Sequence, residues 1–227
     1  MAEGGGAEAA RAAESVARLS YGRLLAYLAR EWRDITAAED ALADAFASAL
    51  ATWPRIGTPT SPEGWLMTAA RHRLLDLAKG RKVRTAAVDT LLDLADERAE
   101  PAPEIPDKRL ELMFVCTNPG IDAGVRTPLM LQTVLGLDAA RIGSSFLVSP
   151  AAMGQRLSRA KARIAAAGIR FDRPAPADLP ERAQSVTEAI FAAYGTGWED
   201  LSGTGSRGLS TEAIWLGRVL VSLLPGD

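Results

Sequence analysis

The stretch DAARIGSSFLVSPAAMGQRLSRAKARIAAAG, residues 138–168, predicts two helices that are joined by a tight turn. Asp138 can cap the first helix. Ser149 supplies an N-cap oxygen for the second, and Pro150 suits its first position because no N–H is needed there. Gly168 then ends the second helix. We interpret the stretch as a helix-turn-helix.

The second of these helices has a buried stripe and a basic surface. Ile142 and Phe146 of the first helix are expected to face the same core. Apolar residues recur at three- and four-residue spacing, which predicts a face that packs inward: Met153, Leu157, Ala160 and Ile164. Polar residues fall on the other faces: Gln155, Arg156, Arg159 and Arg163. On spacing alone, a plain surface hairpin of two helices with solvated arginines stays an open alternative.

Composition favours an all-helical protein. The chain has 227 residues, enough for one large or two small domains. Alanine, leucine and arginine dominate, and long alternating runs of β-branched residues are missing. The formal net charge of −2 is unlike that of an isolated DNA-binding domain, so basic patches must be local.

The cysteine count and the hydropathy of the sequence indicate the cellular compartment of the protein. Cys116 is the single cysteine, which excludes disulfides within the chain and cysteine-based metal sites. No apolar run approaches the roughly 20 residues of a membrane span, and the alanine-rich start lacks the basic residues of a signal peptide. We expect a soluble, cytoplasmic protein without a membrane partner.

The first half of the chain predicts a small helical domain over residues 15–84, after a flexible N-terminus over residues 1–14. One helix should run from Val16 to Trp32. A capping box, Thr36-Ala-Ala-Glu39, should begin the next, which buries Ala38, Leu42, Ala45, Phe46 and Ala49. Asp40 and Asp44 lie on its polar side, where a merely solvated face is the alternative.

A loop and a basic helix complete this domain. Residues 53–62 hold three prolines and a glycine, which predicts a loop. Ser61 and Pro62 then begin a helix that gathers cations: Arg71, His72, Arg73, Lys79, Arg81, Lys82 and Arg84. Such density is typical of phosphate binding, although a basic helix end is also favoured by the helix dipole. His72 has no titrating partner nearby in sequence, so we expect a polar contact residue.

An acidic, proline-rich linker separates the two domains. It covers residues 85–106, with a short helix expected around residues 91–95. Asp107 and Asp122 can each cap a further helix, and the second of these stops at Gly136. Together with the helix-turn-helix they form a four-helix domain over residues 107–172.

The order of these pieces resembles an RNA polymerase sigma factor of the sigma-70 family. The motifs are AEDALADAF (38–46), GWLMTAARHRLLDLAKGRK (64–82), the acidic linker and LSRAKARI (157–164). More narrowly, the chain is similar to the extracytoplasmic-function (ECF) group, which keeps only regions 2 and 4. Residues 110–164 look like a subgroup with a tetratricopeptide-like C-terminal extension.

The resemblance implies partners and contact residues. Core RNA polymerase would bind the region 2 domain through its β′ clamp helices, on residues that match region 2.2: Asp40, Ala43, Asp44 and Phe46. The partners would also include the β flap and promoter DNA. The −10 element would be held by Arg71, His72, Arg73, Lys79, Arg81 and Lys82, and the loop over residues 53–62 would capture a flipped base. The −35 element would be held by Ala151, Ala152, Gln155, Arg156 and Arg159.

Residues 173–227 predict a short helical C-terminal extension. The first helix should end at Tyr194-Gly195, and the second should be capped by Ser210 or Thr211 and expose an apolar face that includes Trp215. Two helices are an incomplete array, since such units need about three repeats to bury their faces. We expect the extension to contact region 2 or region 4.

A helix-turn-helix regulator that acts without polymerase is the alternative function. The acidic net charge and the acid-faced helix argue against it. We expect neither an enzyme nor a cofactor, because the sequence has no Gly-rich phosphate loop, no metal-ligand cluster and no nucleophile paired with a base.

Overall fold

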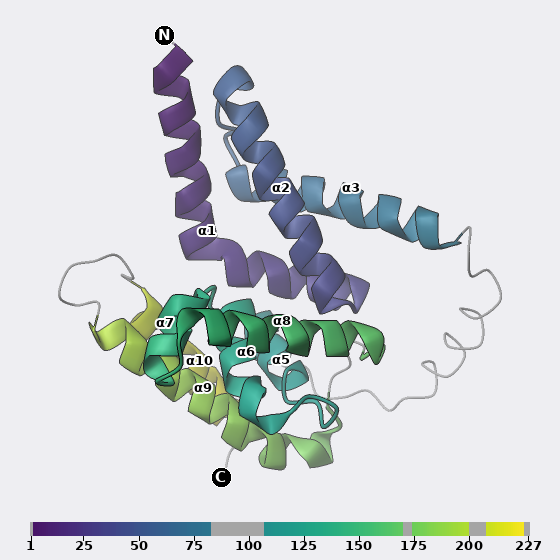
Figure 1. Cartoon of the computed structure of the whole chain (residues 1–227), viewed down its shortest axis with the longest axis vertical. Coiled ribbons are helices and arrows are strands. Elements are labelled where there is room, and N and C mark those ends of the chain that lie inside the picture. The colour runs from purple at the N-terminus through teal and green to yellow at the C-terminus, as the bar shows by residue number, and fades with distance from the viewer. Residues whose placement is uncertain (1, 83–106, 170–173, 200–207, 225–227) are drawn as a thin grey trace.

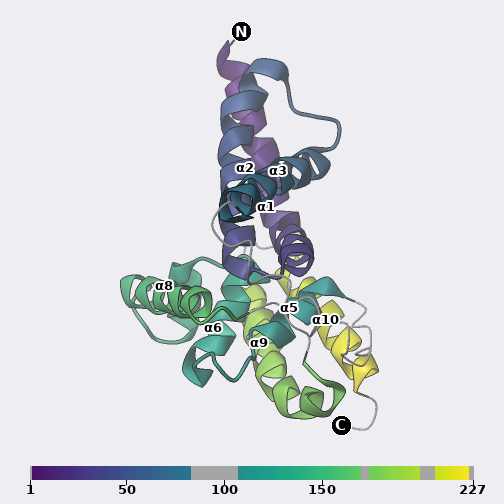
Figure 2. The ribbon, with the colours of Figure 1, turned by 90° about the vertical axis from the view of Figure 1, so that its right-hand side faces the viewer.

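The protein is all-α. The structure, a computed structural model, describes residues 2–82, 107–169, 174–199 and 208–224, and these contain helices without any strand. The helices form two layers, with α1–α3 on one side and α5–α10 on the other (Figures 1 and 2). In the described part of the chain, no helix is long and apolar enough to span a membrane.

The N-terminal unit consists of α1 (Ala2–Trp32), α2 (Ile35–Ile56) and α3 (Pro62–Lys82). Its core includes Leu25, Leu42 and Leu66, all fully buried. Trp53 and Trp65 meet edge to face with ring centroids 5.5 Å apart, which joins the end of α2 to the start of α3. Helix α1 bends, so its first part runs along α2 and its last part lies over the second layer (Figure 1).

The structure corrects the expectation of a flexible N-terminus. Helix α1 begins at Ala2 rather than at Val16. Ala9 and Ala13 lie one helical turn apart and are buried, because their small side chains let α1 approach α2 closely. Burial of this stripe explains why the helix continues into the Gly/Ala-rich start.

Both ends of α2 also differ from the prediction. The N-cap is Asp34, whose Oδ1 accepts a hydrogen bond from the Ala37 amide at 2.9 Å, so Thr36 and Glu39 form no capping box. At the other end, the helix continues through Pro54 to Ile56 because Trp53 is buried in the core. Gly57, with φ of 87°, ends it, and the predicted loop shrinks to residues 57–61.

The second layer begins with α5 (Lys108–Val115), α6 (Ala123–Thr133), α7 (Ala139–Ser145) and α8 (Pro150–Ala166). The predicted N-caps are confirmed, since each cap side chain accepts a backbone N–H: Asp107, Asp122, Asp138 and Ser149. The predicted stripe of α8 is also confirmed, and all four of its residues are buried: Met153, Leu157, Ala160 and Ile164. Helices α7 and α8 therefore form a helix-turn-helix.

The turn between α7 and α8 departs from the prediction at one residue. Phe146 caps the end of α7 and is 37% exposed, whereas Ile142 is fully buried as expected. A Cβ on Gly143 would lie 2.5 Å from the Val148 carbonyl oxygen, so the chain folds back tightly over this glycine. This close return directs Phe146 away from the core.

The C-terminal helices are η1 (Pro176–Asp178), α9 (Leu179–Glu199) and α10 (Leu209–Leu223). Helix α9 continues beyond Tyr194, and α10 begins after Gly208 without a side-chain cap, so both predicted boundaries are wrong. Helices α9 and α10 pack on each other and on α5, α6 and α7. Helix α10 buries Ala213, Leu216, Val219 and Leu220, while Trp215 stays half exposed.

Two predictions fall on residues that the structure does not describe. The acidic linker over residues 85–106, with its short helix at 91–95, lies wholly outside the described residues. The side chains of Arg81 and Lys82, in the last turn of α3, and the position of Arg84 lie outside them too.

Candidate nucleic-acid and polymerase interfaces

Helix α8 presents the predicted −35 residues on one exposed surface. All five are exposed: Ala151, Ala152, Gln155, Arg156 and Arg159. Because the buried stripe of α8 faces the core of the second layer, these side chains point to solvent. Arg159 donates from Nη2 to Gln155 Oε1 at 3.0 Å, a contact between residues one helical turn apart.

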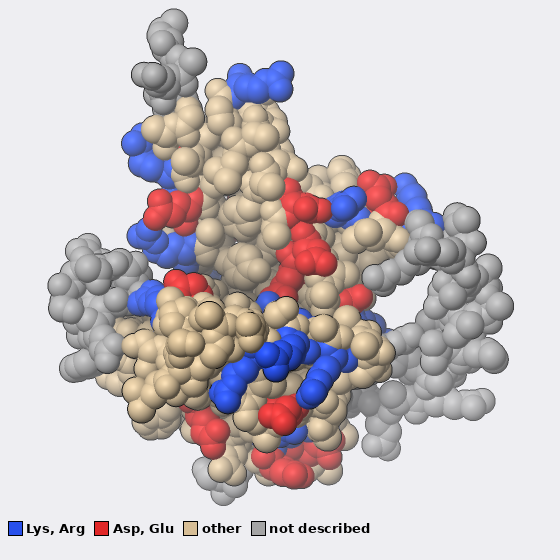
Figure 3. Space-filling view, in the orientation of Figure 1, with Lys and Arg blue, Asp and Glu red and all other residues tan. Residues whose placement is uncertain are grey.

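The three arginines of α8 share a groove with the start of α6. Arg156, Arg159 and Arg163 line a cavity of about 280 Å³ together with Asp122 and Gly124. The Asp122 carboxylate accepts a hydrogen bond from the Gly124 amide at 2.9 Å, which occupies it as the cap of α6. The groove therefore has an excess of donors, and such a surface suits phosphate or the acceptor edge of guanine. Figure 3 shows basic side chains gathered over α8.

The cations of α3 are arranged differently, because acids of the neighbouring helices hold two of them. Arg71 pairs with Glu31 of α1 at 2.9 Å, and Arg73 pairs with Asp44 of α2 at 2.7 Å. These four side chains are each about half exposed. His72 is exposed, and Lys79 lies 3.9 Å from Asp76. The surface of α3 is thus less cationic than its sequence indicates.

Three of the four predicted polymerase contacts lie on the exposed side of α2. Asp40, Ala43 and Asp44 are exposed. Phe46 is partly buried and stacks on Tyr21 of α1, with ring centroids 6.3 Å apart. The structure therefore groups the acids with Ala43, while Phe46 also packs toward α1.

Glu39 joins this acidic surface to α8, a link that sequence reasoning missed. Its Oε1 accepts from Lys161 Nζ at 2.9 Å although the two residues are 122 positions apart. Burial raises the pKa of Glu39 above its usual value, with Asp40 adding to the effect, and Lys161 opposes it. Burial also raises the pKa of Tyr21, helped by the charges of Glu39 and Asp40.

The space between α2 and α8 is a groove of about 720 Å³. Asp40 and Ala43 line one wall, and Ser158, Lys161 and Ala162 line the other. Part of the predicted polymerase surface thus faces the helix that carries the predicted −35 residues. No local pattern signals this arrangement, since it depends on how the two layers meet.

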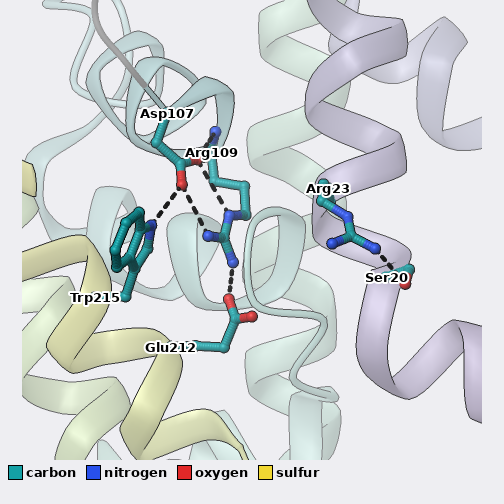
Figure 4. A network of polar contacts seen from close by, with 6 residues as sticks. All are labelled: Ser20, Arg23, Asp107, Arg109, Glu212 and Trp215. Carbon is teal, nitrogen blue, oxygen red and sulfur yellow. Dashed lines mark hydrogen bonds and ion pairs between the residues drawn. The ribbon is translucent and has the colours of Figure 1, made fainter.

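A second polar network attaches α10 to the start of α5 (Figure 4). Asp107 accepts hydrogen bonds from Arg109 Nη2 at 2.8 Å and from Trp215 Nε1 at 3.0 Å. Glu212 forms an ion pair with Arg109 from the other side. Burial tends to raise the pKa of Asp107, but the hydrogen bonds and charge of Arg109, with Trp215, hold it below its usual value. The indole of Trp215 thereby ties the extension to the cap of α5.

The metal-ligand side chains of the described residues are scattered, and the single cysteine is a core residue. Among them, no three His, Cys, Asp or Glu side chains cluster as metal ligands. Cys116 is fully buried, which raises the pKa of its thiol to about 12. Its Sγ lies 3.8 Å from Thr133 Oγ1, so the thiol is a packed core group.

One comparison with known proteins matches the first layer and another matches most of the chain. Residues 17–84 match the family described as sigma-70 region 2. An uncharacterized protein of Rhizobium meliloti (strain 1021) is 38% identical over 209 residues, a match that covers 88% of this chain and 49% of that protein. The chain thus spans about half the length of the curated relative it matches. No solved structure matches it. The region 2 match supports a sigma factor of the sigma-70 family.

Proposed function

We propose that this protein is an ECF-type sigma factor, because residues 17–84 match sigma-70 region 2 and the order of motifs along the chain resembles that group. It binds core RNA polymerase, recognises promoter DNA and directs the start of transcription in the cytoplasm. The chemistry of RNA synthesis belongs to the polymerase. The region 2 match carries the proposal, and the exposed arginine surface of a helix-turn-helix in the second layer supports it.

In this proposal, the polymerase binds the acidic side of α2. The β′ clamp helices contact Asp40, Ala43 and Asp44, with Phe46 at the edge, and these acids complement a basic partner surface. The β flap binds the helix-turn-helix domain. The ion pairs between acids of α1 and α2 and the arginines of α3 do not prevent polymerase binding. A surface ion pair contributes only about 0–1 kcal/mol, so its acid can readily exchange one cation for another.

The two cationic helices then hold the two promoter elements. The −10 element lies along α3, near Arg71, His72, Arg73 and Lys79, and the loop over residues 57–61 together with the end of α2 holds a flipped base. The −35 element takes α8 in its major groove, with Ala151 and Ala152 near the bases and Arg156 and Arg159 reaching base edges or phosphates.

The C-terminal helices are proposed to support the −35 domain. They pack on α5, α6 and α7, and Trp215 and Glu212 hold the residues that begin α5. Removal of residues 174–227 is therefore expected to lower both the stability of this domain and promoter output. If neither changes, the C-terminal helices have no such role.

The test is transcription with purified components. Core RNA polymerase with this protein should produce run-off transcripts from a subset of a genomic fragment library, and neither component alone should select those fragments. The alternative, a helix-turn-helix regulator that acts without polymerase, predicts selective DNA binding by the protein alone. Absence of selective transcripts together with such binding would favour that alternative.

A further inference from the structure

Three contacts close the two layers of the molecule against each other. Lys161 of α8 reaches Glu39 of α2 at 2.9 Å. Arg30 of α1 lies 3.9 Å from Glu111 of α5, whose side chain is only 2% exposed. A Cβ on Gly22 of α1 would lie 1.6 Å from the Val134 carbonyl oxygen, so α1 touches the backbone that follows α6. Besides the apolar packing of α1 on α5, the layers thus meet through two buried carboxylates and one bare glycine.

Buried carboxylates make this closure reversible. A carboxylate loses hydration when it is buried, and a single cation offsets that loss only in part. When the layers separate, both carboxylates regain water and Glu111 keeps its pair with Lys108 at 3.4 Å, so breaking the cross-layer ion pairs has little net cost. The two buried carboxylates therefore fix how the layers fit together, but they add little to the free energy that favours the closed arrangement.

The closed arrangement overlaps the proposed polymerase surface. Asp40 and Ala43 line the groove whose opposite wall is formed by Ser158, Lys161 and Ala162 of α8. A basic helix of a partner, laid along the acidic side of α2, would need the space that α8 occupies. None of the five −35 residues lines this groove, and Arg156 and Arg159 stay exposed. Closure thus restricts one interface and leaves the other open.

We propose that α8 covers, within the same chain, part of the acidic side of α2 that takes the cationic helix of the polymerase. Lys161 serves as the internal counterpart of the partner's basic side chain. The unbound protein is held closed, and polymerase engages α2 fully once α8 has moved away. This inference rests on the proposed sigma-factor function.

Gly22 offers a test that leaves the acidic surface intact. Alanine is favoured over glycine within a helix, so Gly22→Ala strengthens α1 itself. Its methyl group collides with the Val134 carbonyl only when the layers are closed. Gly6, on the same helix, is the matched control, because a Cβ there would have no other atom within 4 Å.

Opening can be measured without polymerase. Spin labels on Ser48→Cys of α2 and Ala165→Cys of α8 occupy exposed positions, and the single native cysteine, Cys116, is buried. Electron–electron double resonance should give a short distance for the otherwise native chain and for Gly6→Ala. Gly22→Ala should shift the distribution to longer distances.

The same variants are then titrated with core RNA polymerase. If about nine-tenths of the unbound chain is closed, opening raises the apparent affinity about tenfold, so Gly22→Ala should bind about tenfold more tightly than Gly6→Ala. Lys161→Gln should shift both readouts in the same direction, and Lys161→Arg should restore them. If circular dichroism shows that Gly22→Ala is not folded, the two Lys161 variants provide the test instead.

The outcomes separate this inference from the proposed function. Binding of polymerase by every variant with equal affinity, or a label distance that Gly22→Ala and Lys161→Gln leave unchanged, overturns the internal competition while the sigma-factor function stands. Failure of the native chain to bind polymerase overturns the proposed function and the competition with it.

Discussion

Helices α3 and α8 are both rich in cations, yet the two helices differ in how far neighbouring acids engage those cations. Arg71 and Arg73 of α3 are held by acids of α1 and α2. Within the described residues, no ion pair joins Arg156, Arg159 or Arg163 of α8 to an acid, and these three line an open groove. The density of cations along a sequence therefore does not show how many of them are available to bind a partner.

The difference suits two kinds of contact with DNA. Arginines that are not engaged by acids can reach base edges or phosphates at once, as recognition of a −35 duplex requires. Arginines that are paired with acids become available when those acids find another cation. Since Asp44 is one of the proposed polymerase contacts, its engagement would release Arg73 toward the −10 DNA.

The largest expected effect comes from removing a cation of α8. Arg156→Ala should lower transcription from promoters that depend on a −35 element by about 5- to 150-fold, because a bidentate arginine–guanine pair gives about 1–3 kcal/mol of discrimination. Run-off transcription measures the change. Binding to core polymerase should stay unchanged, and Arg11→Ala, which removes an exposed cation of α1, should affect neither. Equal losses in transcription and polymerase binding would contradict the role given to α8.

Charge reversal on α2 tests the acid that holds α3. Asp44→Arg should weaken core polymerase binding by at least about tenfold, because like charges across an interface cost several kcal/mol. The variant should fold normally, since the lost pair with Arg73 is half exposed. Asp76→Arg reverses an exposed acid of α3 and serves as the control in the same competition assay. If both variants bind equally well, the acidic side of α2 is not the polymerase surface.

Among the residues that the structure describes, Lys161 is the one cation of α8 that pairs with an acid, and this pair gives a pH test. Burial raises the pKa of Glu39 in the folded protein, and the charge of Asp40 adds to this effect, whereas Lys161 lowers the pKa. Tyr21 of α1 also faces Glu39. A raised pKa favours folding below the unfolded value of about 4.3, and the benefit is lost as pH rises through the folded pKa. At neutral pH the ionised side chain is therefore unfavourable.

Glu39→Gln removes that cost, because glutamine is neutral at every pH. Its Tm at pH 7 should exceed that of the native chain by up to about 2–4 °C, and the difference should shrink as pH falls toward 4. Calorimetric scans across this range measure both. Destabilisation at pH 7 that disappears in acid would show that the attraction of Lys161 outweighs the desolvation of Glu39.

The smallest effect is expected for α3. Arg73→Ala should change the free energy of unfolding by at most about 0.5 kcal/mol, because its pair with Asp44 is half exposed. Chemical denaturation measures this value. A loss of several kcal/mol would mean that the pair is a fixed part of the fold, and Arg73 would then not be available to DNA.

Local features of the sequence predicted much of the fold. The caps at Asp107, Asp122, Asp138 and Ser149 depend on residues within three positions, and the stripe of α8 depends on one helix. The candidate residues of α8 were predicted as one exposed surface for the same reason. Neighbours in sequence decide these features, so a sequence can report them.

Features that depend on distant partners could not be predicted in this way. Glu39 fitted a capping box by spacing, but Asp34 takes the cap, and Glu39 meets Lys161 of the other layer. Trp215 was expected on an apolar face, but its indole reaches Asp107, 108 positions away. The helical start of α1 likewise depends on the burial of Ala9 and Ala13 against α2.

In the proposed function, an acidic side of α2 binds polymerase while α8 reads DNA that polymerase helps to hold. A gel shift with promoter fragments, in the presence and absence of core RNA polymerase, tests it most directly. We expect selective retention of fragments by the protein and polymerase together, and weak, unselective binding by the protein alone. Tight and selective binding by the protein alone, unchanged when polymerase is added, would contradict it.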